Sequence, residues 1–335
     1  MNAVGDQKKL VGVTGASGHL GGALCRQLVE SGYGVRALCH HDRRALADLD
    51  IKVFSGDILD AASLDPFLAG CQVVVHCAAI ISIAGDPAGL VNRSNVEGTK
   101  TVLDSSIRHG VKTFIHVSST HAVMEQLDRP VFDETNPRKP EGSFPYDRSK
   151  AAGEELVLAG FKSGQISGCI LRPSSIIGPF DFKPSKLGQA MLDLHRGAIP
   201  VLPPGGYNFV DVRDVAAGII AAIERGKNGE TYLVSGHYAI MREFSGLIAD
   251  CGGKPAPALQ LPFGLLFWLL PVVSFWAKLS HSEQAYTQEM LHALRNGHPN
   301  MVNAKARAEL GWQARPLTES IADFFSWNSS RKGLS

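Results

Sequence analysis

Residues 143–150 read SFPYDRSK and place a tyrosine and a lysine four positions apart, at Tyr146 and Lys150. On a helix, residues at this spacing lie on one face, so the ammonium group would lie near the phenol. A neighbouring positive charge stabilises phenolate and lowers a pKa that is ordinarily about 10. Tyr146 could then give or take a proton near neutral pH as a general acid or base. The alternative is an ordinary surface helix that begins at the tyrosine.

A second candidate group ends the apolar run TFIHVSS at 113–119. This run reads as a buried strand, and the carboxyl ends of parallel strands form the edge where α/β proteins bind ligands. The hydroxyl of Ser119 is therefore expected to hold the reacting oxygen beside Tyr146. The neighbouring Ser118 and a plain serine at a strand end are the alternatives.

A glycine-rich turn follows the first apolar run. The stretch TGASGHLGG carries Gly15, Gly18 and Gly21 at the spacing G-x-x-G-x-x-G, after an expected strand and before an expected helix. Small residues there let the backbone approach a pyrophosphate at the helix N-terminus, where free N–H groups favour an anion. This context favours a dinucleotide site over a glycine turn without a ligand.

The end of the second expected strand, 34–39, indicates which dinucleotide binds. An NAD site usually places an acid there, and an acid would repel a 2′-phosphate. This chain has Cys39 followed by His40, Asp42 and Arg43, with Arg36 inside the strand. The missing acid and the nearby guanidinium groups favour NADP(H), whereas NAD(H) stays open if Asp42 bends back to the ribose. Solvated surface is the alternative for the arginines.

The elements that must position these residues alternate in type. Val- and Ile-rich runs are separated by amphipathic stretches, and the runs lie at 9–15, 34–39, 51–56, 72–78 and 113–119. This alternation predicts an α/β fold of Rossmann type, with a doubly wound parallel sheet and helices on both faces.

A change in pattern after about residue 172 predicts a second, smaller lobe. Pro and Gly become denser there, and helices are expected without regularly alternating strands. We expect an NAD(P)-binding domain over 1–171, with a returning segment near 207–236. A smaller substrate-binding lobe is expected over 172–206 and 237–330.

Composition excludes several function classes. The 335 residues are 44% hydrophobic and 19% charged, with a net charge of +1, which argues against a dedicated nucleic-acid partner. The six Cys show no C-x-x-C spacing and the twelve His no H-E-x-x-H arrangement, so we predict no metal site and a reducing compartment. The start MNAVGDQKKL shows no apolar segment of a secretory signal, so a cytoplasmic protein is expected.

Over nearly its whole length the chain resembles the extended short-chain dehydrogenase/reductase family. The stretches that carry the resemblance occur in the family's order and are TGASGHLG (14–21), GDILD (56–60), HCAA (76–79), NVEGT (95–99), HVSST (116–120), YDRSK (146–150) and LRPSSIIGP (171–179). The chain is most similar to dihydroflavonol 4-reductase-like and 3β-hydroxysteroid dehydrogenase-like members, together with bacterial proteins labelled sugar epimerases.

The resemblance implies roles for individual residues. Tyr146 would be the acid/base, and Lys150 would activate it and hold the nicotinamide ribose. Asn95 would orient Lys150 through a water, a surface helix Asn being the alternative. Asp57 would meet the adenine amino group, where a turn or N-cap Asp is the alternative. Relatives often pair through two long helices, so a homodimer through 88–109 and 146–163 is expected.

Two sets of residues follow from these motifs. Those expected at the cofactor are Gly15, Ser17, Gly18, His19, Leu20, Gly21, Arg36, His40, Arg43, Asp57, Ile58, Cys77, Ala78, Ala79, Tyr146, Lys150, Pro173, Ser174 and Ser175. Those expected at the substrate are Ile81, Ser119, Thr120, Tyr146, Phe180 and Phe209.

Residues 258–277 contain no charged residue and read ALQLPFGLLFWLLPVVSFWA. This stretch gives information on the kind of substrate. Pro262 and Pro271 interrupt it, and a membrane-spanning helix tolerates Pro only with compensation. We expect two short apolar helices that line a hydrophobic pocket or lie on a membrane surface, with a buried core helix as the alternative. Similar insertions in steroid-dehydrogenase-like relatives imply an apolar substrate.

The sequence thus predicts an NADP(H)-dependent oxidoreductase that interconverts a ketone or aldehyde and an alcohol on a mostly apolar small molecule. One alternative is a nucleotide-sugar or other epimerase that returns the hydride from a retained NAD(P). Pro173-Ser174 stand where such epimerases usually carry an Asn, which disfavours this alternative. Another is a non-catalytic NADPH-sensing or interaction protein of the same fold.

Overall fold

The computed structural model describes residues 9–40, 42–82, 85–279 and 286–332. Its main sheet has seven strands in the order β10-β6-β5-β4-β1-β2-β3, and every pair runs parallel. The strands are β1 (Leu10–Thr14), β2 (Gly34–Cys39), β3 (Lys52–Ser55), β4 (Val73–His76), β5 (Thr113–Val117), β6 (Ser167–Pro173) and β10 (Thr231–Val234). The predicted strands and the Rossmann-type parallel sheet are confirmed.

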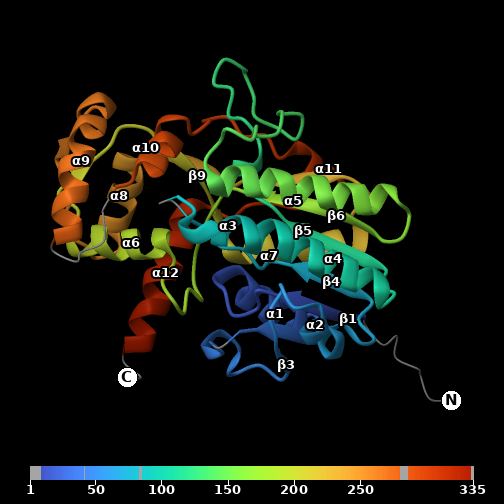
Figure 1. Cartoon of the computed structure of the whole chain (residues 1–335). Helices are drawn as coiled ribbons and strands as arrows, with labels where there is room; N and C mark the ends of the chain where they lie inside the picture. The colour runs from blue at the N-terminus through green and yellow to red at the C-terminus, as the bar shows by residue number, and fades with distance from the viewer. Residues whose placement is uncertain (1–8, 41, 83–84, 280–285, 333–335) are drawn as a thin grey trace.

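Helices cover both faces of this sheet. One buried apolar cluster joins one face to α1 (His19–Glu30), α7 (Val212–Arg225) and α11 (Ala304–Leu310). Another joins the opposite face to α2 (Ala61–Leu68), α4 (Gly98–Arg108) and α5 (Pro145–Lys162). Figure 1 shows α4 and α5 side by side above the strands. Because the strand interiors are apolar on both sides, the sheet is buried between the two layers.

A π-helical turn over Arg93–Glu97 joins α3 (Leu90–Asn92) to α4. Short 3-10 turns occupy Arg44–Leu46, Pro87–Gly89 and Thr120–Ala122. The last of these follows β5 directly and begins with Ser119 as its N-cap. The carboxyl end of β5 therefore turns sharply where the sequence places its candidate hydroxyl.

The smaller lobe contains strands as well as helices. Its sheets pair β7 (Ser175–Ile177), β9 (Gly206–Asp211) and β11 (His237–Ile240), and β8 (Val201–Leu202) with β12 (Leu259–Gln260). Its helices are α6 (Lys186–Arg196), α8 (Met241–Asp250), α9 (Phe263–Leu279), α10 (Gln288–Arg295) and α12 (Leu317–Lys332). The expectation of helices without alternating strands is therefore wrong, because the Pro- and Gly-rich segments are turns between short strands.

The apolar stretch forms one helix, so the expected pair of short helices is also wrong. Pro262 precedes α9, and Pro271 lies inside it. Pro271 leaves one intrahelical hydrogen bond unmade, a local loss that the Leu-rich turns around it offset. No helix within the described ranges is long and apolar enough to cross a membrane. Figure 1 shows α9 (orange) at the edge of the smaller lobe, beside α10.

Candidate active site

The structure brings Ser119, Tyr146 and Lys150 together at the carboxyl end of β5. Pro145 occupies the first turn of α5, where its fixed φ and missing N–H suit a helix start, and so places Tyr146 at the helix entrance. The hydroxyl of Ser119 lies next to the phenol of Tyr146 and can hydrogen-bond to it. One turn further, the ammonium of Lys150 donates to the carbonyl of Val117 at 2.7 Å. This is the arrangement of a proton donor, an orienting hydroxyl and a cation.

Burial decides the protonation states of this group. It raises the pKa of Tyr146 to about 12, while the hydrogen bond from Ser119 opposes the rise. It lowers the pKa of Lys150 to about 8, against the attraction of Glu154. The sequence predicts a lowered pKa for Tyr146; in the structure desolvation outweighs the effect of Ser119, and the net shift is upward. Tyr146 is therefore protonated at neutral pH and can donate a proton.

Asn95 connects the loop after β4 to the helix that carries Tyr146. Its side chain is buried, accepts from the N–H of Ile80 at 2.7 Å and donates to the carbonyl of Ile80 at 3.0 Å. It also donates to the hydroxyl of Ser149 on α5 at 3.0 Å. Asn95 thus acts on Lys150 indirectly at most, and its role through a water stays a prediction.

The glycine turn has the close packing that a dinucleotide site requires. Gly15 has φ +66°, and a Cβ there would lie 2.7 Å from the N atom of Ala78 at the end of β4. A Cβ on Gly21 would lie 2.2 Å from the carbonyl oxygen of Gly15. Gly18 is the N-cap of α1 and carries no side chain to cover the free N–H groups of the first turn. These residues fit the pyrophosphate of NAD(P).

The segment after β2 meets the segment after β3. The imidazole of His40 lies 3.5 Å from the carboxylate of Asp57, and the guanidinium of Arg43 donates to the hydroxyl of Ser55 at 2.9 Å. His40 and Arg43 therefore lie together at the strand ends, as predicted for a ribose-binding edge. The carboxylate of Asp57 also accepts from the N–H of Leu59 at 2.9 Å, as in a turn.

The carboxylate of Asp42 pairs with Arg44 and is not available to a ribose in this arrangement. Arg44 donates to both carboxylate oxygens of Asp42, at 3.0 and 2.5 Å. These hydrogen bonds lower the pKa of Asp42 to about 2. The acid is therefore ionised and engaged with Arg44.

Arg36 lies elsewhere, and its placement at the cofactor is wrong. Its guanidinium donates to the carbonyls of Pro66 and Phe67 at 2.9 and 3.1 Å, and it lies 5.3 Å from the ring centroid of Phe54. The residue stands in the middle of β2 with its side chain toward α2. Alternate residues of a strand face opposite sides of a sheet, and the sequence did not fix which side this one takes.

The other predicted cofactor residues follow the same edge. The imidazole of His19 lies 2.9 Å from the carbonyl of Pro179, whereas the side chain of Leu20 packs into the core. Ile58 packs against Gly98 of α4. Residues at the glycine turn, at the end of β4 and at the end of β6 complete the set, namely Ser17, Cys77, Ala78, Ala79, Pro173, Ser174 and Ser175.

A pocket beside Tyr146 is lined by residues of both lobes. It is lined by Thr120, His121, Glu125, Phe132, Ser174, Ser175, Tyr207, Asn208, Ala293, Gly297 and Met301. Thr120 is thus placed where the sequence predicts a substrate contact. Ile81 lies on the loop after β4 and is 69% exposed, so it stands at the surface and outside this lining.

Two predicted substrate residues are wrong. Phe209 is 1% exposed and stacks on Phe244 with ring centroids 4.1 Å apart, so it belongs to the core of the smaller lobe. Phe180 lies between the guanidinium of Arg26, at 5.0 Å, and the ring of Trp327, at 6.1 Å, on the side of α1 and α12. Both are apolar residues next to motif positions, and tertiary packing decided which way they point.

His121 and Asp147 were not among the residues predicted from the sequence. Nδ1 of His121 lies 3.0 Å from a carboxylate oxygen of Asp147, and its ring meets the Tyr146 ring edge to face at 5.8 Å. The available signal was that Asp147 directly follows Tyr146 and His121 directly follows the HVSST stretch.

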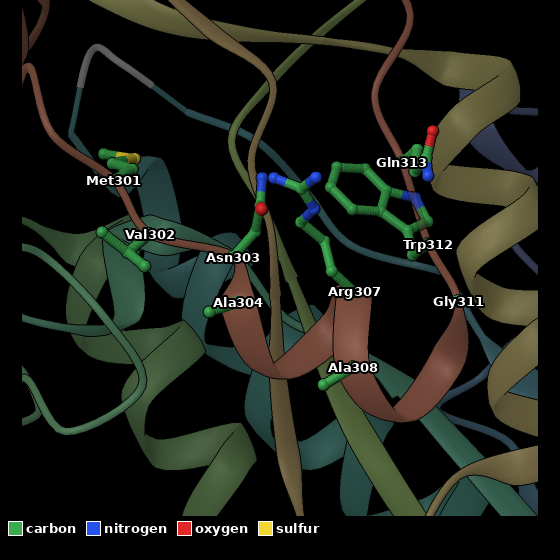
Figure 2. A pocket seen from close by; sticks show the side chains of 9 residues that line it. All are labelled: Met301, Val302, Asn303, Ala304, Arg307, Ala308, Gly311, Trp312 and Gln313. Carbon is green, nitrogen blue, oxygen red and sulfur yellow. The ribbon is translucent and has the colours of Figure 1, made fainter.

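A larger hollow of about 650 Å³ lies along α11 and holds none of the predicted site residues. Figure 2 shows the side chains of Asn303, Arg307 and Trp312, which line it, near one another. The amide of Asn303 donates to the carbonyl of Ser235 at 2.8 Å, which ties this segment to the end of β10. The active site is therefore assigned from the Ser119, Tyr146 and Lys150 geometry and not from the size of a pocket.

A parallel Rossmann sheet with a glycine turn after β1 and a Ser–Tyr–Lys group at its carboxyl edge defines an NAD(P)-dependent enzyme. Residues 11–235 match the model of the NAD dependent epimerase/dehydratase family. The chain belongs to this family, that is, to the extended short-chain dehydrogenases/reductases.

Three curated relatives match the chain over most of its length and of their own. Sterol demethylase protein B of Methylococcus capsulatus is 30% identical over 327 residues, covering 95% of this chain and 98% of that protein. A Synechocystis protein named provisionally as a dihydroflavonol 4-reductase is 31% identical, covering 94% and 93%. A Stigmatella aurantiaca ketoreductase of a farnesylated dihydroquinoline oxide is 30% identical, covering 90% and 91%. The crystal structure of gox2253 superposes with a TM-score of 0.83 at 32% identity, covering 97% and 99%.

Proposed function

We propose that this protein is an NADP(H)-dependent oxidoreductase that interconverts a ketone or aldehyde and an alcohol on a mostly apolar small molecule. The observation that carries the proposal is the phenol of Tyr146 beside the hydroxyl of Ser119, with the buried Lys150 one turn away on the same helix. The nicotinamide, when bound, would supply or accept the hydride. The protein's own groups must then orient the carbonyl oxygen and move one proton.

Each of the three residues has a distinct task in this proposal. Ser119 positions the carbonyl oxygen by a hydrogen bond, and Tyr146, protonated at neutral pH, donates its proton to that oxygen during reduction. The ammonium of Lys150 stabilises the phenolate that this step leaves behind. In alcohol oxidation the same proton returns to Tyr146.

The preference for NADP(H) rests on the segment after β2. Asp42 is engaged with Arg44, whereas Arg43 and His40 lie at the strand ends. We expect Arg43→Ala to weaken NADPH binding about tenfold or more while NADH binding changes little. Arg108→Ala, on the distant end of α4, is the matched control. Equal weakening of both cofactors by Arg43→Ala would show that this guanidinium does not contact a 2′-phosphate.

An apolar substrate is supported by the aromatic side chains beneath α9. The ring of Phe267 lies 4.9 Å from the ring of His292, which in turn lies 5.6 Å from the ring of Phe144. Phe144 is the N-cap of α5, two residues before Tyr146. These rings therefore connect α9 through α10 to the start of α5, two residues before Tyr146. The sterol and farnesyl compounds in the names of the relatives are consistent with a bulky apolar substrate.

The opposite face of α9 supports contact with a membrane surface. Leu265, Trp268 and Val272 are 39%, 72% and 53% exposed on successive turns. The sequence holds no charged residue between Lys254 and Lys278. We expect sedimentation with phosphatidylglycerol-containing vesicles, lost in Trp268→Glu and kept in Leu127→Glu, which alters an exposed leucine outside α9.

We also propose that two copies pair through α4 and α5, which lie side by side on one face of the sheet (Figure 1). The mass of a single chain in sedimentation equilibrium would contradict the dimer.

The direct test supplies NADPH and NADH separately with steroids, flavanonols, aldehydes and sugar nucleotides, and follows reduced cofactor by its absorbance. Net consumption with an apolar carbonyl is the expected result. If cofactor is not consumed while a sugar nucleotide is interconverted, the protein is an epimerase and the proposal is wrong.

A further inference from the structure

An imidazole–carboxylate pair stands directly beside the proton donor. Nδ1 of His121 and Oδ1 of Asp147 are 3.0 Å apart, and Asp147 is the residue after Tyr146 on α5. The backbone N–H of His121 donates to the hydroxyl of Ser119 at 3.2 Å, and the imidazole ring lies 5.8 Å from the Tyr146 ring, centroid to centroid. The imidazole is therefore fixed next to both groups that would hold a reacting oxygen.

The hydrogen bond to Asp147 fixes which nitrogen faces the pocket. An ionised carboxylate only accepts, so Nδ1 carries a proton and Nε2 is the nitrogen left for another partner. Within the described part of the chain, Nδ1 of His121 makes the side-chain hydrogen bond, to Asp147. His121 lines the pocket together with Thr120, Ser174 and Ser175, and its side chain is 33% exposed.

The charges around the pair favour a protonated imidazole. Burial alone would lower the pKa of His121, but Asp147, and then Glu125, raise it above its ordinary value. The positive charge of Lys139 opposes this rise. Its Nζ lies 3.4 Å from Oδ2 of Asp147 and 2.6 Å from a carboxylate oxygen of Glu125. Glu289 of α10 also interacts electrostatically with Asp147 and His121. The imidazole therefore remains a donor over a wider pH range than a solvated histidine.

We propose that His121, held by Asp147, is a substrate-recognition residue that donates a hydrogen bond from Nε2 to a second oxygen, one or two bonds from the reacting carbonyl. The proposal rests on the oxidoreductase function above and narrows its substrate class to carbonyl compounds with an adjacent oxygen function. A simple apolar pocket would need no charged donor at this place, because an unpaired polar group there is costly. The substrate oxygen completes the hydrogen bonds of the pair.

The test uses benzoin and deoxybenzoin, two apolar ketones of the same skeleton that differ by the hydroxyl next to the carbonyl. A hydrogen bond from a charged donor is worth about tenfold to a hundredfold, so wild-type protein should show at least about a tenfold higher kcat/KM for benzoin. His121→Ala should reduce the ratio to near one, chiefly by lowering kcat/KM for benzoin.

Two further variants separate recognition from a structural role. His121→Gln keeps a neutral donor near the position of Nε2 and should retain part of the preference at every pH. In the wild type the preference should fall as pH rises through the raised pKa of His121. His109→Ala removes a similar pair, with Asp65 at 2.8 Å, at the far end of α4 and should change nothing.

The proposal is overturned if the wild type treats the two ketones alike or accepts neither, or if His121→Ala keeps the preference. Failure of the proposed function looks different. In that case the wild type shows no Tyr146-dependent consumption of cofactor with any ketone of the wider panel. Tyr146-dependent turnover of other ketones without a role for His121 would overturn this proposal alone.

Discussion

The ion pair beneath the active site offers a quantitative test of how the fold holds Tyr146 and Lys150. Glu154 lies one turn after Lys150 on α5, is fully buried, and accepts from Arg172 of β6 at 2.8 and 2.7 Å. Arg138 donates to the same carboxylate at 3.3 Å. Glu154→Gln leaves the guanidinium of Arg172, which is 3% exposed, without its counter-charge. Breaking one side of a buried pair costs about 3–5 kcal/mol.

A matched exposed pair provides the control. Arg26 also makes a bidentate pair, donating to Asp48 from Nη1 and Nη2 at 2.8 and 2.9 Å, but the side chain of Asp48 is 62% exposed. Asp48→Asn should cost no more than about 1 kcal/mol. Urea unfolding followed by tryptophan fluorescence measures both variants under one condition. If Glu154→Gln is as mild as Asp48→Asn, the pair does not anchor α5 to the sheet and the reasoning fails.

The pH dependence of the same measurement has a definite sign. Burial would raise the pKa of Glu154, but the hydrogen bonds and charge of Arg172 hold it below its ordinary value of 4.5. A carboxyl group with a lowered pKa in the fold stabilises the protein above its unfolded pKa and loses that contribution as pH falls through the folded pKa. The advantage of the wild type over Glu154→Gln should therefore be constant near neutral pH and shrink only in acid.

Two further predictions concern the cofactor turn and the catalytic lysine. Gly21→Ala should abolish most NADPH binding, measured by fluorescence titration, because its Cβ would lie 2.2 Å from a backbone oxygen. Gly246→Ala is the control and should leave binding intact, because its Cβ would have no atom within 4 Å. Normal NADPH binding by Gly21→Ala would contradict the assignment of the glycine turn as the pyrophosphate site. Lys150→Met should gain stability relative to the wild type at pH 7, because the fall of the Lys150 pKa from 10.5 to about 8 corresponds to ~3 kcal/mol of penalty for the charged form. That gain should shrink between pH 8 and 10.5 as the folded wild type loses its buried charge, and a gain independent of pH would show that Lys150 is not desolvated.

Much of the fold was predictable because its signals are local. Most strands of the main sheet are short, mainly apolar runs, and Gly15, Cys77 and Ser119 follow within two residues of such runs. Tyr146 and Lys150 needed only the helical period to share a face. The glycine turn needed only its place between β1 and α1.

What was not predictable depends on tertiary contacts. Arg36 and Phe209 lie beside motif positions, and only packing against α2 and Phe244 shows that they point away from the site. The desolvation that raises the pKa of Tyr146 is likewise invisible in a sequence. His121 and Asp147 are 26 positions apart, so only the folded chain shows them as a pair.

The most direct test of the central claim compares wild-type protein and Tyr146→Phe in one assay that measures NADPH binding and stoichiometric formation of alcohol from an accepted ketone. Tyr33→Phe is the control, since it removes a hydroxyl bonded to Glu224 outside the site. The account predicts that Tyr146→Phe binds NADPH nearly as well as the wild type and loses at least about a hundredfold in turnover. Turnover within a few fold of the wild type would contradict the assignment of Tyr146 as the proton donor.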